Sequence, residues 1–318
     1  MTEFTPGRLG YGAANVGNLY RAMTDDDARD ILDAAWDVGI RYFDTAPHYG
    51  LGLSERRLGQ FLADKPRNEY VVSTKVGRLL RPNPQGAGQL DLDNDFAVPA
   101  DLQRVWDFSP DGIRCSVDES LQRTGLDRFD VVYLHDPERY DLQGGIDRAL
   151  PALVGLRESG LVDRIGVGSM TTATLLACVQ TDSLDLVMVA GRYTLADQSA
   201  LTDLVPACRE YGVGIVNAAV FNSGLLATDF PGFDARYDYD VVPAGLLARV
   251  QHIAALCREA GVSLAAAALQ YSLRDDAVRT VVVGGSSPQQ IRQNAARLDE
   301  VIPSELWHRL IQHELIVA

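Results

Sequence analysis

The sequence is poor in the residues that build disulfide frameworks and metal centres. Its four cysteines, Cys115, Cys178, Cys208 and Cys257, form no CxxC pair and fall in helix-like segments. The five histidines show no spacing that suits a shared metal ion. We therefore expect a cytoplasmic protein with buried free thiols and without a metal site.

Positive charge and long apolar runs are also scarce. Lys and Arg number 29 against 43 Asp and Glu, which gives a net charge of −14. Such an acidic surface repels nucleic acids and anionic lipids. No apolar run approaches the roughly 18 residues of a membrane span, and the start, MTEFTPGRLG, is unlike a secretory signal. We expect neither nucleic acid nor membrane as a partner.

Two common nucleotide-binding motifs are missing. No GxGxxG lies between a first strand and helix, and no GxxxxGK[ST] occurs. Their absence argues against a Rossmann domain and a P-loop.

Short apolar strands instead alternate with amphipathic helical patterns along the whole chain. This alternation predicts βα units around a parallel sheet, and eight units close into a (β/α)8 TIM barrel, one domain over 1–318. The predicted strands are 8–14, 41–46, 69–75, 129–137, 162–170, 184–191, 213–219 and 278–285.

The helical segments complete the barrel pattern. Thr24 is a good N-cap, and acidic residues fill the turn that follows it. Long loops, roughly 78–108 and 219–243, follow strands three and seven, on the face where barrel active sites form. The predicted helices are 24–39, 54–62, 109–125, 151–160, 171–180, 200–212, 244–260, 263–273, 287–298 and a C-terminal helix from 303 onward.

Ionisable residues end three successive predicted strands. Asp44 ends the second strand, Lys75 the third and His135 the fourth, and Tyr49 follows Asp44 in a Gly-rich turn. Adjacent strand ends converge in a barrel, so we expect these four side chains to share one pocket. A free Tyr has a pKa of about 10, which a neighbouring ammonium lowers. Asp44 would hold Lys75 in place, and His135 would orient a substrate oxygen. The set suits proton transfer to or from that oxygen.

With these residues in place, the chain resembles the aldo-keto reductases over nearly its whole length. The resemblance implies the catalytic tetrad Asp44, Tyr49, Lys75 and His135. It also implies a nicotinamide dinucleotide bound across the barrel mouth without a Rossmann fold and without metal. The matching segments are FDTAPHYGLGLSERRLG, VVSTKVG, GLDRFDVVYLHDP, RIGVGSM, FNSGLLA and VVVGGSSPQQIRQN.

The segments APHYG, WDFSPDGI and AGRYTL resemble a narrower branch, the D-threo-aldose (L-fucose) 1-dehydrogenases, with L-galactose and pyridoxal 4-dehydrogenases nearby. Members of this branch oxidise a cyclic hemiacetal to a lactone. Alternatives are a pyridoxal 4-dehydrogenase, an NADPH-dependent aldehyde or ketone reductase, a barrel isomerase and a non-enzymatic nucleotide-binding regulatory barrel.

The family pattern is broken where it holds the nicotinamide. Ser169 or Met170 stands at the position of its Asn, Ala190 at that of its Gln, and Ala218 at that of its stacking aromatic. Other residues would therefore take over these tasks. The candidates around the nicotinamide are Ser169, Arg192, Asn217 and Phe221.

The rest of the cofactor would lie on two later loops. The resemblance places the pyrophosphate at Ser223, Gly224 and Leu225. It places the adenosine at Gly284, Gly285, Ser286, Gln290 and Asn294. NADP-using members commonly carry Lys and Arg at the positions of Gly284 and Gln290. Because both are uncharged here, we expect NAD to be preferred, with NADP possible.

The expected partner is a small sugar, aldehyde or hemiacetal. Tyr20, His48 and Trp106 are the candidates for contacting it, Trp106 by stacking on the apolar face of its ring and His48 by a hydrogen bond. We expect a monomer or a homodimer.

Overall fold

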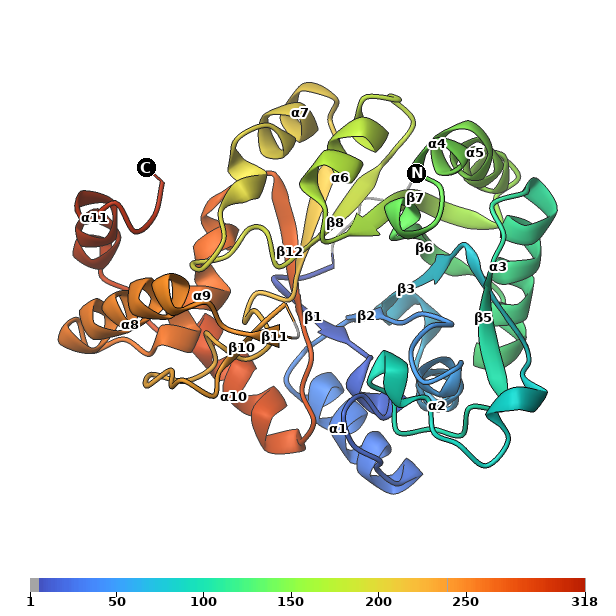
Figure 1. Cartoon of the computed structure of the whole chain (residues 1–318), viewed down its shortest axis with the longest axis horizontal. Helices are drawn as coiled ribbons and strands as arrows, with labels where there is room; N and C mark the ends of the chain where they lie inside the picture. The colour runs from blue at the N-terminus through green and yellow to red at the C-terminus, as the bar shows by residue number, and fades with distance from the viewer. Residues whose placement is uncertain (1–5, 239, 318) are drawn as a thin grey trace.

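An eight-stranded barrel is confirmed by the computed structural model, which describes residues 6–238 and 240–317. The strands are parallel and close in the order β1-β12-β9-β8-β7-β6-β3-β2, inside a ring of helices (Figure 1). They are β1 (Leu9–Gly12), β2 (Tyr42–Asp44), β3 (Val71–Val76), β6 (Phe129–His135), β7 (Val162–Ser169), β8 (Leu186–Ala190), β9 (Gly214–Ala218) and β12 (Val278–Val283).

The predicted helices are present, including the one at the C-terminal end. The α1 helix begins with a capping box in which Thr24 and Asp27 bond each other's backbone amides. Two short elements not predicted from the sequence, α4 (Leu142–Gly144) and the π-helical turn Gly145–Ala149, lead into α5. The other helices are α1 (Asp25–Asp37), α2 (Leu53–Leu62), α3 (Pro110–Thr124), α5 (Leu150–Glu158), α6 (Thr172–Val179), α7 (Leu204–Glu210), α8 (Ala244–Glu259), α9 (Leu264–Tyr271), α10 (Pro288–Leu298) and α11 (Ser304–Gln312).

The barrel interior is filled by its own small core. Alternate strand residues point inward, and the other set packs against the helices. Because two large tyrosines occupy the interior, the barrel is a packed core and not a pore. The inward cluster consists of Tyr42, Val131, Tyr133, Leu186, Met188, Val216 and Val282.

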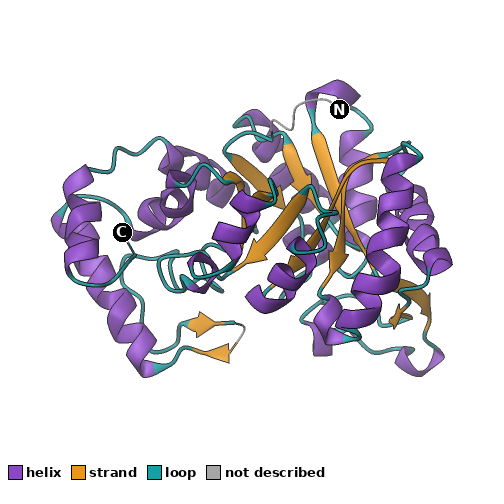
Figure 2. Ribbon diagram, turned by 90° about the horizontal axis from the view of Figure 1, so that it is seen from above, coloured by secondary structure: helices purple, strands orange, loops and turns teal. Residues whose placement is uncertain are grey.

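Both long loops contain a small antiparallel sheet that the sequence analysis did not predict. The loop 77–109 carries β4 (Arg78–Pro82) paired with β5 (Leu102–Trp106). The loop 219–243 carries β10 (Arg236–Tyr237) paired with β11 (Asp240–Val241). Figure 2 shows both sheets outside the barrel wall. Each follows the carboxyl end of a barrel strand, so both can shape the mouth.

All four cysteines are free; three are buried and Cys115 is partly buried. Within residues 6–238 and 240–317, no His, Cys, Asp and Glu side chains form a group of three or more that could hold a metal. In the same residues no single helix is long and apolar enough to span a membrane. Only the pair Ala244–Glu259 and Leu264–Arg274, bent by 105°, reaches that length and composition together.

Candidate active site

The polar residues at the predicted strand ends lie inside the barrel at its carboxyl end. Asp44 and His135 each follow an inward-facing tyrosine by two residues. Side chains two apart on a strand share a face, so both point inward. Lys75 lies opposite inward-facing Tyr133 in the pairing of β3 with β6, so its side chain also points inward. The neighbouring strands β2, β3 and β6 thus bring the three groups to one mouth.

Lys75 is held there by three hydrogen bonds. Its Nζ donates to Asp44 Oδ2 at 2.5 Å, to the Tyr49 hydroxyl at 3.0 Å and to the Thr45 carbonyl at 3.1 Å. These bonds use all three ammonium protons. Asp44 and Lys75 are each only 2% exposed. The Tyr49 oxygen is therefore presented at a fixed place beside a cation.

Lys75 stays charged although it is buried. Burial lowers the pKa of Lys75, but the Asp44 carboxylate and Tyr49 act in the opposite direction, and the net shift is upward. The ammonium is therefore protonated at neutral pH. It can stabilise negative charge that develops on the Tyr49 oxygen.

A chain of hydroxyl groups, which the sequence analysis missed, supports Asp44 from inside the barrel. Ser73 Oγ donates to Asp44 Oδ1 at 2.7 Å. Because this uses the only proton of Ser73, its 3.0 Å bond with Tyr42 must be donated by Tyr42. By the same argument Tyr133 donates to Tyr42 at 3.1 Å. All three hydroxyls donate in the direction of the Asp44 carboxylate, and the chain of bonds thereby fixes the orientation of that carboxylate.

His135 faces the same space as a neutral imidazole. Its ring centre lies 6.2 Å from that of Tyr49 and 5.7 Å from that of His48. Burial, followed by the positive charges of Arg78 and Lys75, holds the pKa of His135 well below its usual range. The structure thus brings all four predicted tetrad residues together.

A cavity of about 580 Å³ opens beside this cluster. His48 and Trp106, two of the predicted substrate residues, both line it. The rest of its wall is mainly polar, because the loop 77–109 contributes charged and amide side chains. These include Arg78, Asn83, Asp91, Gln103 and Arg104, joined by Arg139 from the segment after β6.

His48 has an unused hydrogen-bonding atom at this cavity. Its Nδ1 is buried and has no hydrogen-bond partner in the part of the chain that the structure describes. Burial and the charge of Arg78 lower the pKa of His48 to about 2, so the ring is neutral. Trp106 is less accessible, since the Arg78 guanidinium lies 4.3 Å from its ring centre and the Tyr140 ring stacks on it at 5.5 Å.

Tyr20, the third predicted substrate residue, lies on the loop after β1. Its side chain is 51% exposed, and its amide donates to the Asp95 carbonyl at 2.7 Å. Tyr20 is not among the described residues that line the cavity. Tyr20 therefore does not share this cavity wall with His48 and Trp106.

The opposite half of the mouth is lined by small residues. Ala190 and Ala218, the two departures from the family pattern, are paired across β8 and β9 and are partly exposed. Gly168 pairs with inward-facing His135, and Gly12 with inward-facing Asp44. Small residues thus stand beside the tetrad on these strands.

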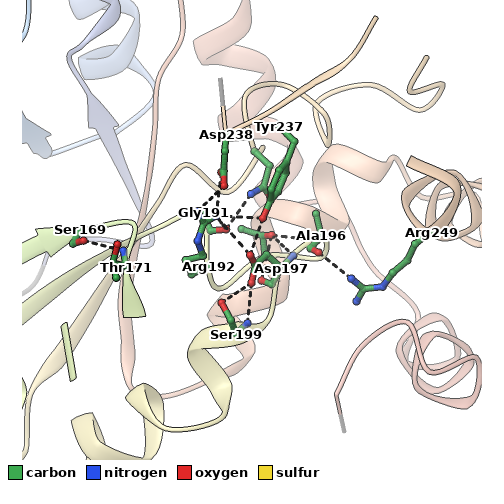
Figure 3. Close-up of polar contacts among 12 residues, drawn as sticks. Ser169, Thr171, Gly191, Arg192, Ala196, Asp197, Ser199, Tyr237, Asp238 and Arg249 are labelled. Atoms are coloured by element: carbon green, nitrogen blue, oxygen red, sulfur yellow. Dashed lines mark hydrogen bonds and ion pairs between the residues drawn. The ribbon is translucent and has the colours of Figure 1, made fainter. Parts of the chain in front are cut away.

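Ser169 ends β7, where its hydroxyl is engaged. Ser169 Oγ donates to Glu138 Oε1 at 2.5 Å. It accepts from the Thr171 amide at 2.8 Å (Figure 3). The side chain is only 2% exposed. It can border a nicotinamide, but its proton is already used.

Arg192 has a different role from the expected nicotinamide contact. Its guanidinium donates to both carboxylate oxygens of Asp238, at 2.5 and 3.0 Å, and lies 3.6 Å from Asp197 (Figure 3). The Tyr237 hydroxyl donates to Asp197 at 2.7 Å. Arg192 therefore ties the loop 219–243 to the segment after β8. Its charge is neutralised by this tether.

Asn217 is turned away from the mouth, so its expected nicotinamide contact is also corrected. Its neighbours Val216 and Ala218 pack with the interior cluster, which directs Asn217 outward. It is 0% exposed, and its Nδ2 donates to the Tyr193 carbonyl and to Ser272 Oγ, both at 2.8 Å. Phe221 packs partly against the outer core.

The turn after β9 uses two of the amides expected to meet phosphate. The Gly224 amide donates to the Phe221 carbonyl at 3.0 Å, and the Leu225 amide to the Asn222 carbonyl at 3.1 Å. The Leu225 side chain is fully buried. Ser223 is exposed and stays the candidate for a phosphate contact.

The loop after β12 forms one unit with the start of α10. The Ser286 amide and hydroxyl donate to Gln290 Oε1 at 2.8 and 3.2 Å. Arg21, from the loop after β1, donates to the Ser286 carbonyl at 2.6 Å. A cation therefore lies here that sequence comparison at Gly284 and Gln290 did not reveal.

The other predicted adenosine residues are partly engaged. The Gly285 carbonyl accepts from the Tyr11 hydroxyl at 3.1 Å. Asn294 is 4% exposed, and its Oδ1 accepts from Arg297 at 3.1 Å. Gly284 is exposed beside them.

Comparisons with known proteins agree with this geometry. The aldo/keto reductase family model matches residues 8–314. The chain is 58% identical to a D-threo-aldose 1-dehydrogenase of Pseudomonas sp, over 97% of this chain and 94% of the relative. It is 38% identical to a pyridoxal 4-dehydrogenase of Microbacterium luteolum, over 99% and 96%. A solved aldo-keto reductase of Bacillus halodurans, in its holo form, has a TM-score of 0.74 at 26% identity, covering 98% of this chain and 92% of that chain.

Replacing Asp44 by Asn should destabilise the protein in a pH-dependent way. The variant leaves Lys75 buried without its counter-ion, which lowers the unfolding free energy by about 3–5 kcal/mol near pH 7. In the wild type, the raised pKa of Lys75 contributes stability below the ordinary lysine pKa of about 10.4, and this is lost only above it. In the variant, burial without the counter-ion lowers the pKa of Lys75 in the folded state. The unfolded state then binds more protons than the folded state, so the free energy of unfolding rises between about pH 7 and pH 9.5.

Urea unfolding at both pH values measures this difference. Asp118→Asn, in the exposed Arg114–Asp118 pair, is the control and should change stability by at most about 1 kcal/mol at either pH. An Asp44→Asn deficit that is equal at both pH values would show that Lys75 does not depend on this carboxylate.

Proposed function

The chain belongs to the aldo/keto reductase family, and from this premise we propose that it oxidises the cyclic hemiacetal of an aldose to a lactone with a nicotinamide dinucleotide. One observation carries the proposal: the Tyr49 hydroxyl lies 3.0 Å from the Lys75 ammonium, and its chain neighbour His48 lines a polar cavity of about 580 Å³. The similar D-threo-aldose 1-dehydrogenase supports the substrate class.

In this proposal Tyr49 takes the proton of the anomeric hydroxyl. The Lys75 ammonium stabilises the phenolate form of Tyr49, which accepts this proton and becomes the neutral phenol, and Asp44 keeps the ammonium in place. His135 donates a hydrogen bond to the same substrate oxygen. The nicotinamide, when bound, accepts the hydride from the anomeric carbon. The opposite direction would make the enzyme an aldehyde or ketone reductase.

The cavity wall favours a hydroxylated substrate. Arg104 lines the cavity and is fixed there by Asp91 through bonds of 2.6 and 2.9 Å. His48 lines the same cavity, where its ring would hydrogen-bond a sugar hydroxyl, and Trp106 would border the apolar face of the sugar ring. Pyridoxal is the second candidate, supported by the aromatic wall at Trp106 and by the similarity to a pyridoxal 4-dehydrogenase.

The side of the mouth opposite the tetrad fits the cofactor. Ala190 and Ala218 leave room for the nicotinamide, and β9 and β12 are neighbours, so the loops that follow them leave from adjacent positions. We assign Ser169 and Phe221 to the border of the nicotinamide and Ser223 to the pyrophosphate. The segment 284–294 would hold the adenosine.

We propose that NAD is preferred over NADP. A cavity of about 210 Å³ beside Ser286 is lined by Arg21 but also by Asp27 and Asp30. Hydrogen bonds from Thr24 lower the pKa of Asp27, so it is anionic. Two carboxylates against one guanidinium give this cavity a net negative charge, which disfavours a 2′-phosphate. We further propose a cytoplasmic monomer or homodimer, in keeping with the four free cysteines.

A substrate panel tests the proposed reaction. Free aldoses, pyridoxal and small aldehydes are each supplied with NAD or NADH, and cofactor absorbance is followed. We expect lactone formation from an aldose with the highest kcat/KM. Tyr49→Phe should lower kcat by about 10²- to 10⁴-fold, the range for a positioned acid or base, while NAD affinity is retained.

Tyr140→Phe is the matched control, because Tyr140 is 53% exposed at the same rim and keeps its ring in the variant. Its kcat should stay near that of the wild type. Turnover of Tyr49→Phe within a few-fold of the wild type would exclude Tyr49 as the proton acceptor. Oxidation of pyridoxal with no aldose oxidised would assign the second candidate function.

The NAD preference is tested by reversing one charge. Asp30→Arg should raise kcat/KM for NADP relative to NAD by about 5- to 150-fold, because a charge-assisted hydrogen bond to phosphate stabilises binding by about 1–3 kcal/mol. Asp26→Arg changes the net charge equally from a neighbouring position outside the cavity lining, and it should leave the ratio almost unchanged. A wild-type kcat/KM that is higher for NADP would refute the preference.

A further inference from the structure

Arg78 links the loop 77–109 to the catalytic histidine. It is the first residue of β4, three residues after Lys75, and its side chain is only 6% exposed. Its Nη1 lies 3.3 Å from His135 Nδ1 in a hydrogen bond, and its Nη2 donates to Asp136 Oδ2 at 2.7 Å. The guanidinium also lies 4.3 Å from the ring centre of Trp106. Three contacting groups therefore hold one buried cation in place.

The chemistry of arginine fixes the direction of its bond to His135. A guanidinium has only donors and does not lose its proton in proteins. His135 Nδ1 must therefore accept, which leaves no proton on that nitrogen. In a neutral imidazole the single proton then resides on Nε2.

We propose that Arg78 is a positioning residue that fixes His135 as a neutral imidazole protonated at Nε2, ready to donate to the substrate oxygen. The last clause rests on the proposed function, because it assigns His135 to the oxygen that Tyr49 deprotonates. The tautomer itself is a property of the protein alone.

The Asp136 carboxylate favours protonation of His135, and Arg78 acts against this effect. Asp136 Oδ2 lies 3.6 Å from His135 Nε2 and would draw a second proton onto the ring. Arg78 bonds to the same oxygen and neutralises it. An imidazolium at this place would add a second cation beside Lys75.

The other groups that face His135 act in the same direction as Arg78 or are neutral. Lys75 comes from β3, His48 and Tyr49 from the turn after β2, and Arg139 from the segment after β6. Burial is the largest reason for the low pKa of His135, and Arg78 is the largest charge effect. Removing Arg78 both deletes this charge and frees the Asp136 carboxylate.

Nitrogen NMR of ¹⁵N-histidine-labelled full-length protein tests the proposal, with His135→Gln used to assign the His135 signals. Wild type should show the Nε2-protonated neutral ring at neutral pH and keep it on acidification well below pH 6. In Arg78→Met the ring should titrate at a clearly higher pH than in the wild type, because a neighbouring positive charge is gone while burial remains. Its neutral form should become a mixture of tautomers. Arg78→Lys, which keeps a charge and a donor, should restore most of the wild-type behaviour.

Kinetics supply the second readout. Arg78→Met should lower kcat/KM by about 10- to 100-fold, the range seen when a residue that orients a working imidazole is removed. It should also move the acidic limb of the pH profile to higher pH than in the wild type. Arg81→Met is the matched control, because Arg81 lies on the same strand and bonds to Glu119 instead. Its pH profile should equal that of the wild type.

The same tautomer and titration in Arg78→Met as in wild type would overturn the proposal. Should Arg78→Met not fold, Asp136→Asn decides, because Arg78 still donates to Nδ1 there and the tautomer must be unchanged. A changed tautomer in Asp136→Asn would show that Asp136 sets the proton. The spectra need no substrate, so a wrong substrate class would fail only in the activity assay.

Discussion

The site depends on one buried contact, the 2.5 Å bond between Lys75 and Asp44. Neither charge would be tolerated alone at 2% exposure, because an unpaired buried charge costs several kcal/mol. Together they fix an ammonium at the barrel mouth, and this ammonium fixes the Tyr49 oxygen. The hydroxyl chain from Tyr133 through Tyr42 and Ser73 extends the same constraint into the core. Barrel packing and proton transfer thus share residues.

The two long loops supply the parts of the site that the barrel strands do not. The hairpin of β4 and β5 brings Arg78 and Trp106 to the mouth from the two ends of one loop, 28 residues apart and paired in register. On the other side, the Arg192–Asp238 tether holds the loop 219–243 against the segment after β8. The barrel therefore sets the position of the tetrad, while the loops determine the cavity in which a substrate is selected.

The sequence predicts the fold and the grouping of the tetrad because both follow from local rules. Strand-helix alternation indicates a barrel, and polar residues at successive strand ends converge wherever such strands are adjacent. Arg192 and Asn217, expected beside the nicotinamide, bond to other protein groups instead, and the sequence does not indicate this, for different reasons. Arg192 is neutralised by Asp238, 46 residues later, from a turn whose path no local pattern indicates. For Asn217 the difficulty is the alternation of inward and outward side chains along β9. Which residues face inward becomes known only once the strand register is known.

Arg78 gives a third reason why a residue of the site is not predicted from the sequence. A basic residue three positions after a strand-end lysine is a visible signal, but its partner His135 lies 57 residues away. The resemblance to a family could not supply it either, since the tetrad motif says nothing about what orients the histidine. Such supporting residues emerge only from packing.

The central claim is that Tyr49 at the barrel mouth takes a proton from a substrate oxygen, while the carbon that carries this oxygen gives a hydride to the nicotinamide. A single-turnover reaction with an aldose deuterated at C1 and excess NAD tests this most directly. The account predicts a lactone, with the deuterium recovered in the reduced nicotinamide and a slower transfer than from the undeuterated sugar. Reduced nicotinamide that contains no deuterium, or its formation without a lactone, would contradict it.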